Sequence, residues 1–260
     1  MNIGISTLYL IGKKTSETLL TLEKYGEECK VWELTLNGNF KLNKKLTRKL
    51  LDYASAYGFR YLLHAPFTDL NIASLNPSVR RLTLKALEST LEYAHRLEAR
   101  TVVIHPGFRG PIDYFYPGEA ERQQLNMALR LLGKAENLGV NLSIENMTKG
   151  SKALLITVED FEKFFSDPRL EKLGLAFDTG HAHTVGQLDL FLEKFKHKIN
   201  HIHLHDNDGS ADQHLGLGDG TIDWTSFTDK VKTFFNGNLI IESIEKPYED
   251  FQKLKSVLKT

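Results

Sequence analysis

Residues 173–205 read LGLAFDTGHAHTVGQLDLFLEKFKHKINHIHLH, and this stretch decides the fold class. Two short apolar runs, Leu173–Asp178 and Ile199–His205, flank an amphipathic segment, Leu188–Phe195. Both runs are rich in Leu, Ile or aromatic residues, which is typical of strands covered on both faces. A strand, a helix and a second strand in this order predict a βαβ unit with parallel strands.

The same unit repeats along the chain. Eight apolar runs are expected as strands: Ile3–Ser6, Val31–Leu36, Tyr61–His64, Thr101–His105, Asn141–Glu145, Leu173–Asp178, Ile199–His205 and Asn238–Glu242. Helices are expected at Thr15–Tyr25, Leu46–Tyr57, Pro77–Leu97, Pro117–Leu138, Val158–Phe165, Leu188–Phe195, Trp224–Phe235 and Tyr248–Lys259. The clearest is Pro77–Leu97, where one stripe is expected to hold Leu82, Leu84, Leu87, Leu91 and Ala94. Eight βα units in about 250 residues predict an α/β fold, a (β/α)8 TIM barrel, as a single domain over residues 1–260.

A doubly wound open sheet is the competing architecture, but Ser6–Gly12 offers no glycine-rich phosphate loop after the first strand. Equal numbers of basic and acidic residues, 33 each, with 41% hydrophobic residues exclude a disordered chain and argue against a surface built for nucleic acid. A single cysteine, Cys29, excludes a disulfide scaffold. No apolar run is long enough for a membrane span, and Met1–Leu10 lacks the basic start of a signal peptide, so a cytoplasmic protein is expected.

Histidine and acidic residues gather where the predicted strands end. Of the ten histidines, only His95 and His197 lie away from a strand end or the loop after it. The strand ends and following loops supply His64, His105, Glu145, Asp178, His181, His183, His201, His203, His205 and Glu242. In a barrel, catalytic residues come from these ends.

Each of these residues alone has an ordinary structural explanation, such as a buried histidine with a hydrogen bond or a glutamate paired with a lysine. Together they would form a dense, mutually repelling cluster unless a cation bound among them. Mixed imidazole and carboxylate ligands suit Zn, Mn, Fe or Co. The loop Asp206–Asp223 is rich in Gly and Asp, but it lacks the glutamate and flanking helices of a calcium-binding EF-hand. Asp212 and His214 in this loop are therefore expected to point two further ligands at the barrel mouth.

The motifs HAPF, HPG, IEN, DTGH, HLHD, DQHLGLGDG and IIES occur in this order. The chain thereby resembles the xylose isomerase-like TIM barrels, a superfamily that includes sugar phosphate isomerases and epimerases and endonuclease IV. The resemblance extends from the first strand to the eighth.

In the isomerases and epimerases, one divalent cation is held by residues that match Glu145, Asp178, His203 and Glu242. The resemblance implies that Glu145 and Glu242 also form the catalytic acid/base pair. Endonuclease IV binds three zinc ions, and its additional ligands match His64, His105, His181, Asp212 and His214. The implied cofactor is a divalent ion (Zn, Mn, Mg, Fe or Co), as one ion or as a cluster of two or three.

The chain also departs from endonuclease IV. The connections Asn37–Lys44 and Phe67–Pro77 are short and hold few of the basic and aromatic residues with which that enzyme grips DNA. Gly180 stands where endonuclease IV usually has cysteine. The form that the HLHDND and DQHLGLGDG motifs take here looks more like that of the sugar phosphate isomerase and epimerase group.

The favoured hypothesis is a metal-dependent isomerase or epimerase of a sugar or sugar phosphate, acting through a metal-stabilised enediolate. His181, Arg109 and Lys149 are candidates for binding substrate oxygens or phosphate, although Arg109 and Lys149 could be ordinary surface charges. The alternative is a multinuclear zinc phosphoesterase that cleaves abasic-site DNA, and only then would nucleic acid be a partner. A non-catalytic metal-binding or ligand-sensing barrel is the third possibility. A small sugar is the expected substrate, no membrane association is expected, and a homo-oligomer is possible.

Overall fold

The computed structural model describes residues 1–258 and contains a closed barrel of eight parallel strands in the order β1 to β8. The strands are β1 (Asn2–Ser6), β2 (Val31–Thr35), β3 (Arg60–His64), β4 (Thr101–Ile104), β5 (Asn141–Glu145), β6 (Gly174–Asp178), β7 (Ile199–Leu204) and β8 (Asn238–Ile241). β1 pairs with β8 and thereby closes the barrel. The predicted (β/α)8 TIM barrel is confirmed.

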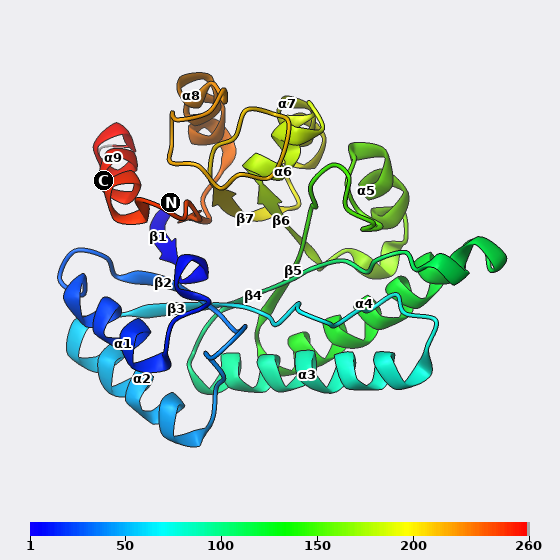
Figure 1. Ribbon diagram of the computed structural model, residues 1–260, viewed down its shortest axis with the longest axis horizontal. Helices are drawn as coiled ribbons and strands as arrows, with labels where there is room; N and C mark the ends of the chain where they lie inside the picture. Colours follow the sequence, from blue (N-terminus) through cyan, green and yellow to red (C-terminus); the bar gives the residue numbers. More distant parts are fainter. Residues whose placement is uncertain (259–260) are drawn as a thin grey trace.

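The helices form a ring around the strands (Figure 1). They are α1 (Thr15–Lys24), α2 (Lys44–Tyr57), α3 (Pro77–Arg96), α4 (Glu119–Leu138), α5 (Val158–Phe165), α6 (Thr179–Thr184), α7 (Leu188–Phe195), α8 (Trp224–Phe234) and α9 (Pro247–Leu258), with short 3₁₀ turns at Leu8–Leu10, Pro111–Phe115 and Pro168–Leu170. Side-chain caps define several starts. The Asn43 side chain, for example, accepts hydrogen bonds from two backbone amides in the first turn of α2. Within the described residues, no helix is long and apolar enough to cross a membrane.

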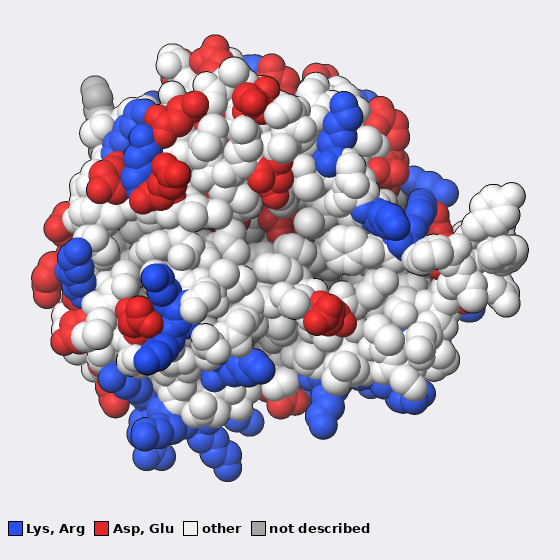
Figure 2. Space-filling model, viewed as in Figure 1, with Lys and Arg blue, Asp and Glu red and all other residues white. Residues whose placement is uncertain are grey.

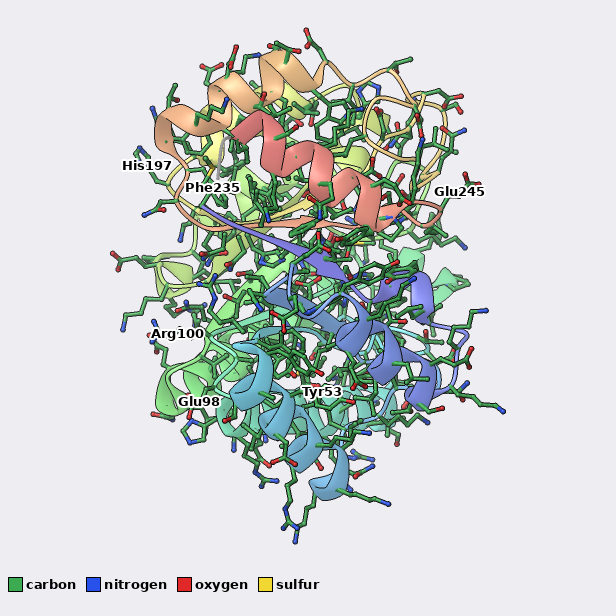
Figure 3. The ribbon with its side chains drawn as sticks, turned by 90° about the vertical axis from the view of Figure 1, so that its left-hand side faces the viewer. Tyr53, Glu98, Arg100, His197, Phe235 and Glu245 are labelled. Atoms are coloured by element: carbon green, nitrogen blue, oxygen red, sulfur yellow. The ribbon has the colours of Figure 1, made fainter. Side chains whose placement is uncertain are left out.

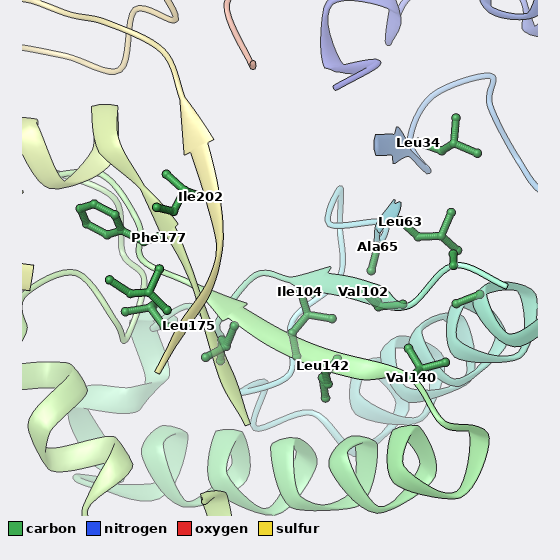
Figure 4. Close-up of a cluster of buried hydrophobic side chains, with 14 of the residues drawn as sticks. Leu34, Leu63, Ala65, Val102, Ile104, Val140, Leu142, Leu175, Phe177 and Ile202 are labelled. Carbon is green, nitrogen blue, oxygen red and sulfur yellow. The ribbon is translucent and has the colours of Figure 1, made fainter. Parts of the chain in front are cut away.

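Alternate residues of each strand face opposite sides of the barrel wall. The outward residues, such as Leu34, Leu63, Leu142 and Phe177, are buried against the helices in one large hydrophobic core (Figure 4). The inward residues form only a small separate apolar cluster, Val31, Leu62 and Ile240. The inward positions nearer the strand ends are largely polar, which is unusual because barrel interiors are mostly filled by branched apolar side chains.

The predicted elements agree with the structure to within about two residues, which is ordinary variation at element ends. One helix, α6, was not predicted. Leu82 was wrongly placed in the buried stripe of α3, because it is 61% exposed whereas Leu87 and Leu91 are buried. The last residue of the predicted helix Tyr248–Lys259 lies outside the described residues.

The two ends of the barrel differ in character. In Figure 3, Arg100, His197 and Phe235, which precede β4, β7 and β8, lie at one end, and Glu245, which follows β8, lies at the other. A cavity of about 990 Å³ opens at the strand starts, among asparagine, arginine and apolar side chains that include Arg100 and Phe235. The histidines and acids singled out by the sequence lie toward the opposite end, so this large cavity is not their site.

Candidate metal centre at the strand ends

Glu145, Asp178, His203 and Glu242, here called the quartet, come together inside the barrel. All four are at most 4% exposed. The Nδ1 atom of His203 lies 2.8 Å from Oε1 of Glu145, 3.6 Å from Oε2 of Glu242 and 3.8 Å from Oδ2 of Asp178. Four strands therefore direct one nitrogen and three carboxylate oxygens at one point.

A second group shares Glu145 with the quartet. His64 and His105, here called the β3–β4 pair, place their Nε2 atoms 3.2 and 3.1 Å from Oε2 of Glu145. Phe67 stacks on the His105 ring with centroids 4.4 Å apart, which fixes the orientation of that ring. Glu145 thus has one oxygen in the quartet and the other between two imidazoles.

A third group lies beside α6. His181, Asp212 and His214 form this loop cluster, in which Oδ2 of Asp212 is 3.1 Å from Nε2 of His181 and Oδ1 is 3.4 Å from Nε2 of His214. His205 is near, and its ring is stacked almost parallel on His214 with centroids 3.9 Å apart. His205 also offers a nitrogen within reach of this cluster, with Nε2 3.7 Å from Oδ1 of Asp212. The same Nε2 atom lies closer to Oδ1 of Asp178, at 3.0 Å.

Local hydrogen bonds explain why these side chains stand where they do. Asn146 joins the ends of β5 and β6, because its Oδ1 accepts from the Asp178 amide and its Nδ2 donates to the Asp178 carbonyl. Asp178 caps α6 by accepting from the His181 amide at 2.7 Å, which turns His181 toward the site. The buried Asp206 accepts from the amide of Gly218 and from the Trp224 indole, so the loop that carries Asp212 is folded rather than free.

The donor set fits divalent ions. A tetrahedral ion with bonds of about 2.0–2.2 Å holds its donors roughly 3.3–3.6 Å apart, and the contacts in the three groups scatter around that range. The Nδ1–H groups of His64, His181 and His214 donate to the carbonyls of Ala65, Asn146 and Glu242. In the neutral imidazole, these bonds keep the proton on Nδ1 and leave Nε2 as the nitrogen that can bind an ion, which is the usual arrangement behind a metal-binding histidine.

The electrostatics of the groups are strongly coupled. Burial opposes the charge of Glu145, but His203 and the β3–β4 pair outweigh burial and hold the pKa of Glu145 well below its usual value. Burial likewise opposes protonation of His181 and His214, yet the neighbouring aspartates raise the pKa of His181 to about 10 and that of His214 to about 9. For His105, burial prevails and lowers the pKa, which favours the neutral imidazole that binds metals. Clustered perturbed groups of this kind mark functional sites.

Two predicted substrate-binding residues are not drawn into these groups. The guanidinium of Arg109 pairs with Glu121 of α4 at 2.7 Å, and Lys149 lies exposed in the β5–α5 connection. His183 contacts Thr221 through its Nε2 atom. His181 is the one proposed substrate-binding residue that lies among the metal donors.

The sequence reasoning missed Glu33 and Asn146. Glu33 is fully buried on β2 and contacts His201 and His203. The signal was present, because VWELT places a charged residue in the middle of an otherwise apolar or weakly polar strand. His201 was expected near the mouth, but it lies deeper in the barrel, beside Glu33.

Figure 2 shows acidic side chains beside the hollow at the centre of one face, whereas lysine and arginine lie mainly toward its edge.

Comparison with known proteins gives the family. Residues 23–259 match the family described as "Xylose isomerase-like TIM barrel". The chain belongs to this family.

Three proteins similar to this chain are of different kinds. An uncharacterized protein of Methanocaldococcus jannaschii, MJ1311, is 31% identical, and the alignment covers 100% of this chain and 88% of the relative. The crystal structure of a D-tagatose 3-epimerase-like protein superposes with a TM-score of 0.90 at 31% identity and covers 100% of this chain and 96% of that chain. A probable endonuclease 4 of Mycobacterium leprae is 26% identical, covering 93% of this chain and 95% of the relative. Both branches named by the sequence resemblance are therefore present among its relatives.

Proposed function

We propose that this protein is a divalent-metal-dependent isomerase or epimerase of a sugar or sugar phosphate, with the quartet as its catalytic metal site. The observation that carries the proposal is the position of Glu242. Its Oε2 atom faces His203 in the quartet, whereas its Oε1 atom is buried and has no hydrogen-bond partner among the described residues. One carboxylate thus offers one oxygen to a cation and keeps the other free to accept a proton.

The proposed chemistry follows from that arrangement. When bound, a divalent cation stabilises negative charge that develops on substrate oxygens. Glu242 would take a proton from the carbon beside a substrate carbonyl, and Glu145 on β5 would serve on the opposite side of the substrate. An epimer would form when Glu145 delivers its own proton to the opposite face of the same carbon while Glu242 keeps the proton that it removed, so Glu145 would have to enter this step protonated. An isomer would form when Glu242 gives its proton to the neighbouring carbon and a hydroxyl proton passes between the two substrate oxygens. The burial of both carboxylates keeps water from competing for the proton.

The 31% identical structure described as D-tagatose 3-epimerase-like supports the same chemistry. Nucleic acid binding requires basic side chains along the backbone path. Of the basic side chains in the connections after the strands, Arg109 is paired with Glu121 and Lys246 with Asp219, whereas Lys149 is exposed. The charge distribution therefore favours a small polyhydroxylated substrate over a duplex.

A second candidate is favoured by one specific contact. Oε2 of Glu145 lies between the Nε2 atoms of His64 and His105, so this carboxylate can bridge one ion in the quartet and another at the β3–β4 pair. Shared carboxylates are typical of centres in which two ions clamp a phosphoryl group. A phosphoesterase that acts on an abasic-site or smaller phosphodiester substrate is thus the alternative.

Two measurements separate the candidates. The purified protein, loaded with Mn²⁺ or Zn²⁺, is incubated with ketohexoses and ketopentoses, free and phosphorylated, in deuterated water. Deuterium at a carbon next to the carbonyl, lost in Glu242→Gln and kept in the surface control Glu92→Gln, is the expected result. The same preparation is then offered an oligonucleotide with one abasic site. Nicking of that strand, abolished by Glu145→Gln, together with no exchange into any sugar, would replace the proposed function with the second candidate.

A further inference from the structure

Glu33 occupies an exceptional place in the barrel. It points inward from the middle of β2, is 0% exposed, and follows the inward apolar residue Val31. Burial of a carboxylate carries a large desolvation cost, which must be offset by partners that contact it. A barrel interior of this kind would ordinarily hold a branched apolar side chain.

The compensating partners lie across the barrel interior, on β7. Oε1 of Glu33 is 3.0 Å from Nε2 of His203, and Oε2 is 2.8 Å from Nε2 of His201. β2 and β7 are not neighbours, because β1 and β8 lie between them in the closed barrel. The contact therefore crosses the barrel interior, and it ends on the one imidazole of the quartet.

The two nitrogens of His203 face different groups. Nδ1 faces Glu145, Glu242 and Asp178, while Nε2 faces Glu33. An imidazole that binds an ion through one nitrogen carries its proton on the other, and a carboxylate acceptor there fixes both the ring orientation and the site of protonation.

We propose that Glu33 is a positioning residue of the metal centre. It accepts the Nε2–H of His203 and so holds Nδ1 as the metal-facing lone pair. Nε2 of His201 lies 2.8 Å from the second carboxylate oxygen, a close contact without hydrogen-bond geometry. Its negative charge also increases the electron donation of the His203 ring to the ion. The inference rests on the proposed quartet but not on which reaction the quartet performs.

A purely structural role makes a different prediction. Replacement of a buried ionic group by apolar residues of similar volume is often neutral or stabilising. If Glu33 only filled space or stabilised the fold, apolar replacement would change stability alone. If it positions His203, the affinity for the ion falls even where stability is kept.

The test uses Co²⁺, because its visible absorption reports both occupancy and ligand geometry. Glu33→Gln keeps the shape of the side chain and an amide oxygen that can accept the Nε2–H of His203, but it removes the negative charge. Glu33→Leu combined with His201→Leu removes the whole support and leaves an apolar interior. Ser143→Ala is the matched control, since Ser143 is fully buried on β5 and its hydroxyl donates to Asn200 rather than to the quartet.

The expected result is a Co²⁺ dissociation constant raised about 10- to 100-fold in the Glu33 variants, the range seen when such supporting groups are removed. The double variant should also show an altered Co²⁺ spectrum. Its melting temperature should fall below that of the wild type by no more than the melting temperature of Ser143→Ala does. A wild-type dissociation constant and spectrum in Glu33→Gln and in the double variant would overturn the inference. A wild-type protein that takes up no Co²⁺ would instead refute the metal centre itself, so the two failures are distinguishable.

Discussion

Gly180→Ala tests how tightly the support of Asp178 is built. A Cβ atom at position 180 would lie 2.0 Å from Cε1 and 2.4 Å from Nδ1 of the His205 ring. That ring is fully buried, stacked on His214 and in contact with Asp178, so it has little room to move. Overpacking of a buried site typically costs about 1–3 kcal/mol.

Gly133→Ala provides the matched control. Gly133 lies within α4, and an added Cβ there meets no atom within 4 Å. Alanine is favoured over glycine in a helix by roughly 0.5–1 kcal/mol, so the control should be slightly stabilised. Both variants replace a helical glycine by alanine and gain this preference. The difference between their stabilities therefore isolates the clash with His205.

The expected difference in melting temperature follows from the size of the chain. Unfolding entropy is about 2.1 cal/mol/K per residue, or roughly 0.55 kcal/mol/K for this chain, so a clash of about 1–3 kcal/mol separates the two variants by about 2–5 °C. Differential scanning calorimetry measures this separation. Gly180→Ala should also weaken divalent-ion binding, because displacement of His205 disturbs Asp178.

A second variant checks the cause. Gly180→Ala combined with His205→Ala removes the ring that causes the clash. The loss of unfolding free energy in the double variant should therefore be smaller, by about 0.5–3 kcal/mol, than the sum of the losses in the two single variants. Equal melting temperatures for Gly180→Ala and Gly133→Ala, with unchanged ion affinity, would refute the packing argument. In this chain, His205 fills the space that a side chain at position 180 would need.

Three further predictions concern charge. In the metal-free protein, His181 and His214 have folded-state pKa values raised to about 10 and about 9, so their stabilising contribution is complete below the unfolded value of about 6.5. Urea unfolding should therefore show stability falling as pH rises from 7 toward 10, and a flat profile would contradict the burial of these charges. Ions compete with the same protons, so apparent ion affinity measured by calorimetry should rise between pH 6 and pH 8. Arg109→Ala breaks an exposed pair with Glu121 and should change stability by at most about 1 kcal/mol, and a large rise in KM would show that Arg109 binds substrate after all.

The fold could be predicted because its signal is repeated. Each strand carries apolar outward residues such as Leu175 and Phe177, and each long helix has an apolar stripe. α6 escaped prediction because TGHAHT has no apolar period, and Asp178 rather than hydrophobic patterning starts this helix. Leu82 was misplaced because an apolar residue on a helix says nothing by itself about which face is covered.

The sequence predicted which residue types form the site, but not how deep in the barrel each side chain lies. Period-two spacing puts His201 and His203 on the same inward face, yet residues two apart along a strand are about 6.6 Å apart. His203 therefore reaches the quartet, while His201 lies a layer below with Glu33. The contact between β2 and β7 across the interior is a property of the closed barrel, and no local pattern in the sequence displays it.

Glu145 and Glu242 look equivalent in the sequence, since each follows a strand of apolar residues, but their surroundings separate their roles. Both oxygens of Glu145 are engaged, one with His203 and the other with the β3–β4 pair. Glu242 keeps Oε1 free. Glu145→Gln should therefore reduce the number of bound ions measured by elemental mass spectrometry, because the loss of its charge weakens both groups it joins.

Glu242→Gln should behave differently. Its amide can still present an oxygen to the quartet, so most of the bound ion is retained while the proton acceptor is lost. The expected result is a fall in kcat of about 10²–10⁴-fold with substrate binding largely kept, the range typical for removal of a general acid or base. Equal ion loss in both variants would mean that the two glutamates are interchangeable ligands, and the assignment of Glu242 as the proton acceptor would then have no support in the geometry.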